Sequence, residues 1–181
     1  MPPYRIDRVQ PGDGARCRAI RLEMLQDTPL AYLETYQHAL ARPAEEWDFR
    51  AARNTQPGNT GYAAVDEATG GWIGVMHAYV PADAADVADT AGAGDRAWLV
   101  GVWVHPDHRG AAAGVTDALL DAVTAWAGDV AEVPRLMLEV HEANARAIAY
   151  YRRRGFTETG DAVPYPLDPT ANELEMELAL T

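Results

Sequence analysis

Residues 105–120, HPDHRGAAAGVTDALL, place a basic turn and a run of very small residues between two patterned segments. The strand-like AWLVGVWV precedes the turn, and the helical pattern GVTDALLDAVTAWA follows it. A helix N-terminus has unpaired N–H groups and a partial positive charge, so an anion can bind there when small side chains leave the backbone accessible. Arg109 adds a full positive charge. The stretch therefore suits a diphosphate, although close packing of a helix against a sheet would select the same small residues.

A second candidate stretch begins about 30 residues later, in HEANARAIAYYRRRGF. Positions 144, 147, 148 and 151 share one face of the predicted helix, because seven residues make about two turns. A tyrosine hydroxyl at position 151 can donate a proton to a leaving group. Structural interpretations stay open here: Asn144 can cap the helix, Tyr151 can pack against a sheet, and Gly155 can end the helix.

The elements that must position these residues follow from periodicity and from the turn residues. Strands are predicted at 4–9, 61–67, 71–80, 97–104, 135–140, 156–160 and 174–180. Helices are predicted at 13–26, within 27–42, and at 43–53, 114–127 and 141–156. Loops are predicted at 81–95 and at 161–172, where DAVPYPLDPTAN is rich in Pro and Asp. The resulting order is β-α-α-α-β-β-β-α-β-α-β-β, a single α/β domain over residues 1–181.

Composition excludes several classes of protein. The chain has 181 residues, a hydrophobic fraction of 48% and a net charge of −12. An acidic surface disfavours nucleic acid, and no apolar run is long enough for a membrane helix. The N-terminus lacks an apolar signal segment, so we expect a cytoplasmic protein. A lone Cys17 and five scattered histidines predict no disulfide and no metal site.

Together the two stretches resemble the GNAT superfamily of acyl-CoA-dependent N-acyltransferases. The first resembles motif A of that family, Arg/Gln-x-x-Gly-x-Gly/Ala after a strand that ends in V-x-V-x-P. The second matches N-x-x-A-x-x-x-Y-x-x-x-G-F. Ala112 occupies the first motif glycine, and we expect this methyl group to weaken or shift binding without abolishing it. The resemblance implies a mixed, mostly antiparallel sheet with a splayed central strand pair, flanked by helices.

The resemblance also implies where acetyl-CoA binds. Its pantetheine arm would pair with backbone groups of the central strand, its diphosphate would meet the small-residue turn, and Asn144 would bond the pantetheine. These acetyl-CoA contacts are Val102, Trp103, Val104, Arg109, Gly110, Ala111, Ala112, Ala113, Gly114, Val115, Asn144 and Tyr151.

The implied chemistry is direct attack of an amine on the thioester, with Tyr151 protonating the departing thiolate. A lysine-like amine, with a pKa of about 10.4, is almost fully protonated at pH 7, so a base should help. Many relatives place a glutamate on the central strand, and AWLVGVWV has none. Glu139 and His141 on the next strand are the candidates, with an ion pair or a strand-end contact as the structural alternative for each.

The acceptor side is expected between PLAYLETYQ and DAVPYPLDPTAN. The candidate residues there are Tyr32, Glu34, Tyr36, Tyr165 and Asp168. Aromatic rings with carboxylates suit a cationic amine, although loop packing explains each residue equally well. The leading hypothesis is therefore transfer of acetyl from acetyl-CoA to a small-molecule primary amine. The alternatives are a protein N-terminal or lysine acetyltransferase and a non-catalytic acyl-CoA sensor. The acceptor, the acyl preference and a homodimer are left open.

Overall fold

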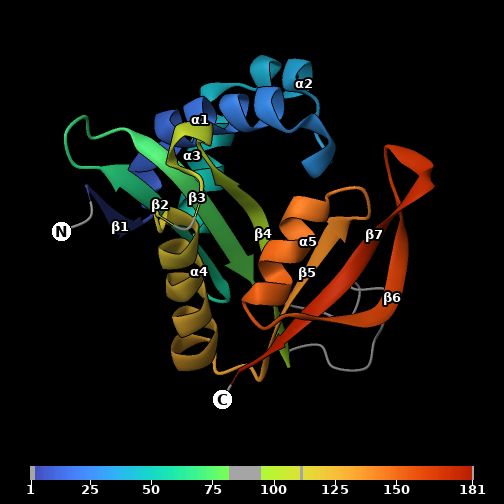
Figure 1. Cartoon of the computed structure of the whole chain (residues 1–181). Coiled ribbons are helices and arrows are strands. Elements are labelled where there is room, and N and C mark those ends of the chain that lie inside the picture. Colours follow the sequence, from blue (N-terminus) through green and yellow to red (C-terminus); the bar gives the residue numbers. More distant parts are fainter. Residues whose placement is uncertain (1–2, 82–94, 111, 181) are drawn as a thin grey trace.

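A computed structural model of the chain describes residues 3–81, 95–110 and 112–180, and this part forms one seven-stranded sheet flanked by helices (Figure 1). The order across the sheet is β1-β2-β3-β4-β5-β7-β6. All neighbouring strands run antiparallel except β4 and β5, which run parallel. The strands are β1 (Tyr4–Arg8), β2 (Asn59–Asp66), β3 (Trp72–Tyr79), β4 (Arg96–Val104), β5 (Arg135–His141), β6 (Thr157–Tyr165) and β7 (Asp168–Ala179).

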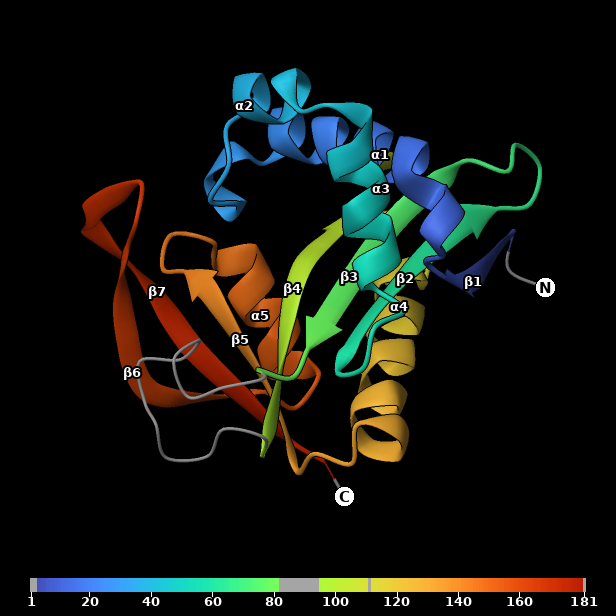
Figure 2. The same cartoon turned by 180° about the vertical axis from the view of Figure 1, so that it is seen from behind.

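Helices cover both faces of the sheet. In Figure 1 α4 and α5 lie in front of it, and the view from behind in Figure 2 shows α1 and α3 on the other face. The helices are α1 (Gly14–Asp27), α2 (Tyr36–Ala41), α3 (Ala44–Arg53), α4 (Val115–Ala125) and α5 (Ala145–Arg153), and the short 3₁₀ turns include η2 (Pro29–Ala31). Within the described ranges, no helix has the length and apolar character to cross a membrane.

Two hydrophobic layers hold the helices to the sheet. The layer under α4 and α5 contains Leu119, Val123 and Ile148 against Leu136 and Leu138. The layer under α1 and α3 contains, among others, Ile20, Met24, Trp47, Val75 and Trp103. Because alternate residues of a strand face opposite sides, the apolar run of β4 contributes to both layers. This double burial explains why AWLVGVWV is apolar at both parities.

The central strands β4 and β5 pair only at their beginnings. The parallel register covers Arg96–Trp98 against Arg135–Met137 and then ends. The β3–β4 register also shifts, between Val75 and His77, and Gly101 has a φ of +61°. An irregularity of this kind bends a strand and increases its twist. Beyond Trp98, β4 therefore pairs with β3 alone, and its other backbone edge faces the space toward α5. The predicted splayed pair is confirmed.

The structure confirms the predicted order of elements but differs at two places. The small residues before α4 form a turn and not its first helical turn, because α4 begins at Val115 after Gly114 with a φ of +68°. The predicted loop 161–172 is wrong, since β6 and β7 form a long hairpin there. Pro164 is tolerated because β6 is an edge strand. The predicted loop at 81–95 falls mostly on residues 82–94, which are outside the described residues.

Candidate active site

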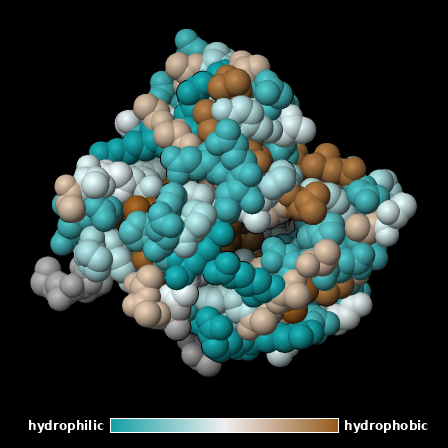
Figure 3. Space-filling view, turned by 45° about the horizontal axis from the view of Figure 1, so that its top comes forward, coloured by the Kyte–Doolittle hydropathy of each residue, from teal (hydrophilic) through white to brown (hydrophobic). Residues whose placement is uncertain are grey.

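A cavity of about 350 Å³ lies where β4 and β5 part. Its wall is formed by the second half of β4, the turn before α4 with the first residues of that helix, α5 with its N-cap, and residues from the segment 28–32 after α1. The space-filling view in Figure 3 shows a hollow with hydrophobic atoms at its floor on this side of the molecule. The lining residues are Thr28, Ala31, Tyr32, Val102, Trp103, Val104, Arg109, Gly110, Gly114, Thr116, Asp117, Asn144, Arg146, Ala147, Tyr150, Tyr151 and Arg153.

The turn before α4 leaves its backbone open on one side of this cavity. Gly110 and Gly114 have φ values of +105° and +68°, a region that residues with a Cβ rarely adopt. A Cβ at Gly110 would meet no atom within 4 Å. Ala112 is exposed and Val115 is buried at the start of the helix, while Ala111 is outside the described residues. Glycine is thus favoured at both positions by conformation. The N–H groups of Ala113 and Gly114 donate to the Gly110 carbonyl, so the N–H groups that an anion could use are those of the first residues of α4.

Arg109 connects the end of β4 to the end of α1. Its Nε donates to the Val104 carbonyl at 2.7 Å, and its guanidinium pairs with Asp27. The Trp103 indole also donates to Asp27, at 2.9 Å. Burial alone would raise the pKa of Asp27, but the hydrogen bonds from Arg109 and Trp103 outweigh it and the pKa is lowered. Arg109 therefore lines the cavity with its charge already shared with a carboxylate.

Tyr32 lies in the cavity and not at the acceptor side where the sequence suggested it. Its ring is buried, and its hydroxyl donates to the Val102 carbonyl at 2.9 Å. The Val102 and Val104 carbonyls, which the resemblance assigns to the pantetheine, thus both accept a bond from a side chain. A carbonyl oxygen has two lone pairs, so each can accept a second donor or exchange its present one.

Tyr151 presents its hydroxyl to the cavity from α5. Its ring is 6% exposed and packs edge-on against Phe156, with the ring centres 5.4 Å apart. Within the described part of the chain its hydroxyl makes no hydrogen bond, and burial raises its pKa. The group therefore stays protonated at neutral pH and is free to donate.

Two neighbours of Tyr151 have structural roles that the sequence left open. Tyr150 also lines the cavity, and its hydroxyl donates to the Thr116 carbonyl at 3.1 Å. Asn144 caps α5, because its Oδ1 accepts from the Ala147 N–H at 3.2 Å. Asn144 also lines the cavity, so the cap leaves its side-chain amide group near any occupant.

Glu139 and His141, the two candidate bases, do not line this cavity. Leu136, Leu138 and Val140 of β5 pack toward α4 and α5, so Glu139 and His141 project from the opposite face. The His141 ring packs edge-on against Tyr165 at 4.8 Å between centres, and its Nδ1 accepts from the backbone N–H of Ala143. The structure therefore gives His141 the strand-end contact that was the alternative to a catalytic role.

Glu139 is exposed on β5 and stands opposite Glu175 in the sheet. Desolvation first, and then the charges of Glu173 and Glu175, raise its pKa. The base role of Glu139 and His141 has no support from the geometry of the cavity.

The residues proposed for the acceptor side are dispersed. Glu34 is 8% exposed and accepts bonds from Arg42 at 2.6 Å and from Arg21 at 3.0 Å, with Arg50 at 3.4 Å. Burial raises its pKa, but the hydrogen bonds and charges of these arginines outweigh that effect and lower it. Glu34 is thus a neutralised carboxylate in an ion-pair cluster, which corrects the expectation that it faces a cationic amine.

The other three acceptor candidates likewise have local explanations. Tyr36 packs against the hydrophobic layer under α1 and α3. Tyr165 is 1% exposed, at the end of β6. The exposed Asp168 accepts bonds from the backbone N–H and the hydroxyl of Thr170, and these hydrogen bonds lower its pKa. Loop and turn packing, the alternative left open for these residues, describes what the structure shows.

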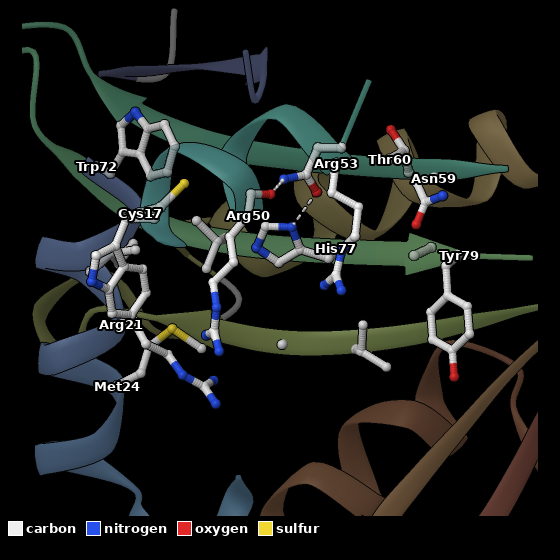
Figure 4. A pocket seen from close by; sticks show the side chains of 17 residues that line it. Cys17, Arg21, Met24, Arg50, Arg53, Asn59, Thr60, Trp72, His77 and Tyr79 are labelled. Atoms are coloured by element: carbon white, nitrogen blue, oxygen red, sulfur yellow. Dashed lines mark hydrogen bonds between the residues drawn. The ribbon is translucent and has the colours of Figure 1, made fainter. Parts of the chain in front are cut away.

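A second cavity, of about 560 Å³, lies on the other face of the sheet under α1 and α3 (Figure 4). His77 of β3 lies at its centre, and its Nδ1 is 2.8 Å from Asn54 Oδ1. The amide of Asn54 donates to the carbonyls of Arg50 and Ala51, which fixes its orientation. Sequence reasoning missed this site. The available signal was a histidine in a mainly apolar strand together with arginines at a helix end.

No group of three or more His, Cys, Asp or Glu side chains that could hold a metal ion occurs among the residues that the structure describes.

Comparisons with known proteins agree with this arrangement. The model of the acetyltransferase (GNAT) family matches residues 21–156. A comparison with curated proteins finds no match. Among solved structures, a GNAT-family acetyltransferase from Streptococcus pneumoniae has a TM-score of 0.77 and 15% identity, with coverage of 98% of this chain and 99% of that one.

Two further structures are similar to this chain. The yncA protein from Salmonella typhimurium, whose structure holds its cofactor acetyl-CoA, has a TM-score of 0.75 and 18% identity, over 98% of this chain and 94% of that one. Nourseothricin acetyltransferase has 27% identity and a TM-score of 0.57, over 69% of this chain and 67% of that one.

Proposed function

Because the chain belongs to the GNAT acetyltransferase family, we propose that it transfers an acetyl group from acetyl-CoA to the primary amine of a small molecule. The observation that carries the proposal is the cavity at the splay of β4 and β5, into which Tyr151 presents an unbonded hydroxyl. The open edge of β4 and the glycine-containing turn lie on the wall of the same cavity. In this proposal the amine attacks the thioester directly within a ternary complex. The amide bond forms as the bond between carbon and sulfur breaks, and no covalent enzyme intermediate forms.

The residues present fit acetyl-CoA. A Cβ at Gly110 would meet no atom within 4 Å, so there is room beside this residue for a diphosphate, and Arg109 supplies a guanidinium group. The carbonyls of Val102 and Val104 face the pantetheine side of the cavity, where they accept N–H donors. When bound, acetyl-CoA supplies an activated acyl group on a thiol leaving group with a pKa of about 8.5.

Tyr151 acts as the general acid in this proposal. Its buried ring fixes the position of a hydroxyl that is protonated at neutral pH and can donate to a departing thiolate. Burial also raises its pKa, which makes it a weaker acid than a free tyrosine. The hydroxyl has no described partner to give up before it donates. We assign no general base among the residues that line the cavity between β4 and β5, called the splay cavity below.

The choice of a small-molecule acceptor rests on two considerations. Both cavities have volumes in the range of small-molecule sites, about 300–1,000 Å³. In addition, the 27% identical nourseothricin acetyltransferase is named for a small molecule. Acetylation of protein N-termini or lysines remains the competing outcome of the assay.

The cofactor assignment is tested by thermal unfolding with CoA and acetyl-CoA. At about 100 times the Kd, a ligand of the folded state adds about 2.7 kcal/mol, which for a chain of this size raises Tm by about 5–10 °C. Ala112→Glu should abolish most of this shift, because it places an exposed carboxylate beside the proposed diphosphate site. Ala112→Lys is the matched control and should keep or increase it.

Position 112 is preferable to Gly114 for this test, because a side chain at a φ of +68° strains the backbone whatever its charge. Absence of any shift at millimolar CoA in the wild type would refute the proposed function. Equal shifts in the two Ala112 variants would show that the turn serves packing and not the diphosphate.

A further inference from the structure

The geometry points to the cavity under α1 and α3 as the acceptor pocket, and to an acceptor amine that also carries a carboxylate or a similarly compact oxyanion. This inference rests on the proposed function and names its substrate class. It reverses the expectation of a cationic acceptor, which rested on the aromatic rings and carboxylates of the predicted acceptor side.

The wall of this cavity is positively charged. Three of the lining residues are arginines, Arg21, Arg50 and Arg53, and no described lining residue is Asp or Glu. Figure 4 shows the side chains of Arg50 and Arg53 extending on the two sides of His77, toward β4. The charges of Arg53 and Arg21 act on the His77 ring, which places both near it.

The positive charge is not fully compensated. Around the cavity, Arg21 and Arg50 share the carboxylates of Glu34 and Glu46 with Arg42. Three guanidinium groups thus face two carboxylates. The side chain of Arg53 makes no hydrogen bond or ion pair with any described residue. An oxyanion in the cavity would meet this excess, and guanidinium groups match the geometry of a carboxylate.

Two buried donors on the cavity wall also lack partners. Thr60 is 1% exposed and Trp47 is 2% exposed, yet the Thr60 hydroxyl and the Trp47 indole N–H make no hydrogen bond in the described part of the chain. Leaving a buried donor unpaired costs about 1–3 kcal/mol. Both residues belong to the lining that also contains the three arginines.

The cavity adjoins the splay cavity through β4. Val100 and Gly101 line the cavity under α1 and α3, whereas Val102, Trp103 and Val104 line the splay cavity. The two cavities also share a partition. Arg21 lines the cavity under α1 and α3, and Tyr32 lines the splay cavity. The guanidinium carbon of Arg21 lies 4.6 Å from the centre of the Tyr32 ring. An amine held by an anionic group near the arginines can therefore project past Gly101 toward a thioester on the other side.

His77 offers the amine a hydrogen-bond acceptor. Because Asn54 Oδ1 can only accept, the Nδ1 of His77 must carry the proton, and Nε2 carries the lone pair. The ring packs against Gly101, where a Cβ would lie 3.1 Å from the His77 Cδ2. Burial, and then the charges of Arg53 and Arg21, lower the pKa of His77 to about 4, so the ring is neutral at pH 7. A neutral imidazole accepts from an amine and does not repel it.

The test compares acceptors in pairs that differ only in the anionic group. Each pair is an L-amino acid and its carboxamide, and CoA thiol release is measured with saturating acetyl-CoA. The carboxamide has the less basic amine, so without an anion site it should be the better acceptor. With the site, kcat/KM should favour the acid by about tenfold or more, as expected for a charge-assisted hydrogen bond.

Arg53→Gln should reduce this preference at least severalfold, mainly by raising KM for the acid, while Arg53→Lys should restore part of it. Arg16→Gln is the control, because Arg16 is an exposed residue of α1 outside both cavities. The Tm shift with acetyl-CoA should be the same in all three variants, since Arg53 does not line the splay cavity.

The outcomes separate this inference from the proposed function. If carboxamides are acetylated as well as the acids, or if Arg53→Gln leaves the preference unchanged, the inference is overturned and the proposed function stands. If acetyl-CoA binds but the acids are not acetylated at all, the inference is likewise overturned. Absence of any Tm shift of the wild type with CoA or acetyl-CoA would refute the proposed function itself.

Discussion

Tyr151→Phe is the sharpest test of the chemistry, because the structure separates its catalytic effect from its structural effect. The substitution keeps the ring, which is 6% exposed and packs on Phe156, and removes only a hydroxyl that has no described hydrogen-bond partner. We therefore expect the free energy of unfolding to change by less than about 0.5 kcal/mol. If the hydroxyl protonates the leaving thiolate, kcat should fall by about 10²–10⁴-fold.

Tyr150→Phe provides the structural comparison on the same helix. That hydroxyl donates to the Thr116 carbonyl at 3.1 Å, so its loss should cost about 1 kcal/mol. In a chain of this size the cost corresponds to about 2–4 °C in Tm. The two substitutions should therefore affect different quantities. Tyr150→Phe should lower stability, and Tyr151→Phe should lower kcat.

The assay is single-turnover acetyl transfer monitored by thiol release, with Tm and CoA affinity measured on the same preparations. Tyr62→Phe, a partly buried tyrosine of β2 that lines neither cavity, is the control for a generic loss of hydroxyl. If Tyr151→Phe keeps more than about a third of the wild-type rate, another group or water protonates the thiolate, because a lost general acid costs far more. If Tm falls together with the rate, Tyr151 is a packing residue.

Two further predictions concern charged groups. Glu34→Gln should lower the free energy of unfolding by about 1–3 kcal/mol, because Arg21, Arg42 and Arg50 lose a buried anionic partner. A urea midpoint equal to that of the wild type would contradict the structural role of Glu34. Between pH 7 and pH 5 the wild type should lose about 2 kcal/mol of stability that His77→Gln does not lose. The His77 pKa is about 4 in the folded chain and about 6.5 when unfolded, so over this range the unfolded state binds the extra proton and stability falls as pH falls. Parallel pH profiles for the two proteins would refute the assignment of a buried neutral imidazole.

Much of the fold was predictable because its signals are local. Alternating and helical periodicities predict the order of the elements, and the small residues after β4 indicate a turn that leaves its backbone accessible. The loop predicted at 161–172 was wrong for an equally local reason, since Pro and Asp residues favour turns but are also tolerated on an edge strand.

The surroundings of individual side chains were not predictable in this way. Tyr32 bonds to Val102 across 70 positions, and His77 bonds to Asn54 across 23. Glu34 looks like a free carboxylate in the sequence, but the packing of α1, α2 and α3 places three arginines around it. Residue type and spacing do not predict these contacts, because the contacts depend on how the helices pack against the sheet.

The sequence by itself determined the family, the order of the elements and the position of the small-residue turn after β4, because each depends on residues close together along the chain. Only the tertiary structure decided the neutralisation of Glu34 and the arginine-lined cavity around His77. The net charge of −12 is a sum over the whole surface, whereas a ligand responds to the few charges within about a Debye length of it. An acidic chain can therefore contain a cationic pocket, and only the folded arrangement reveals it.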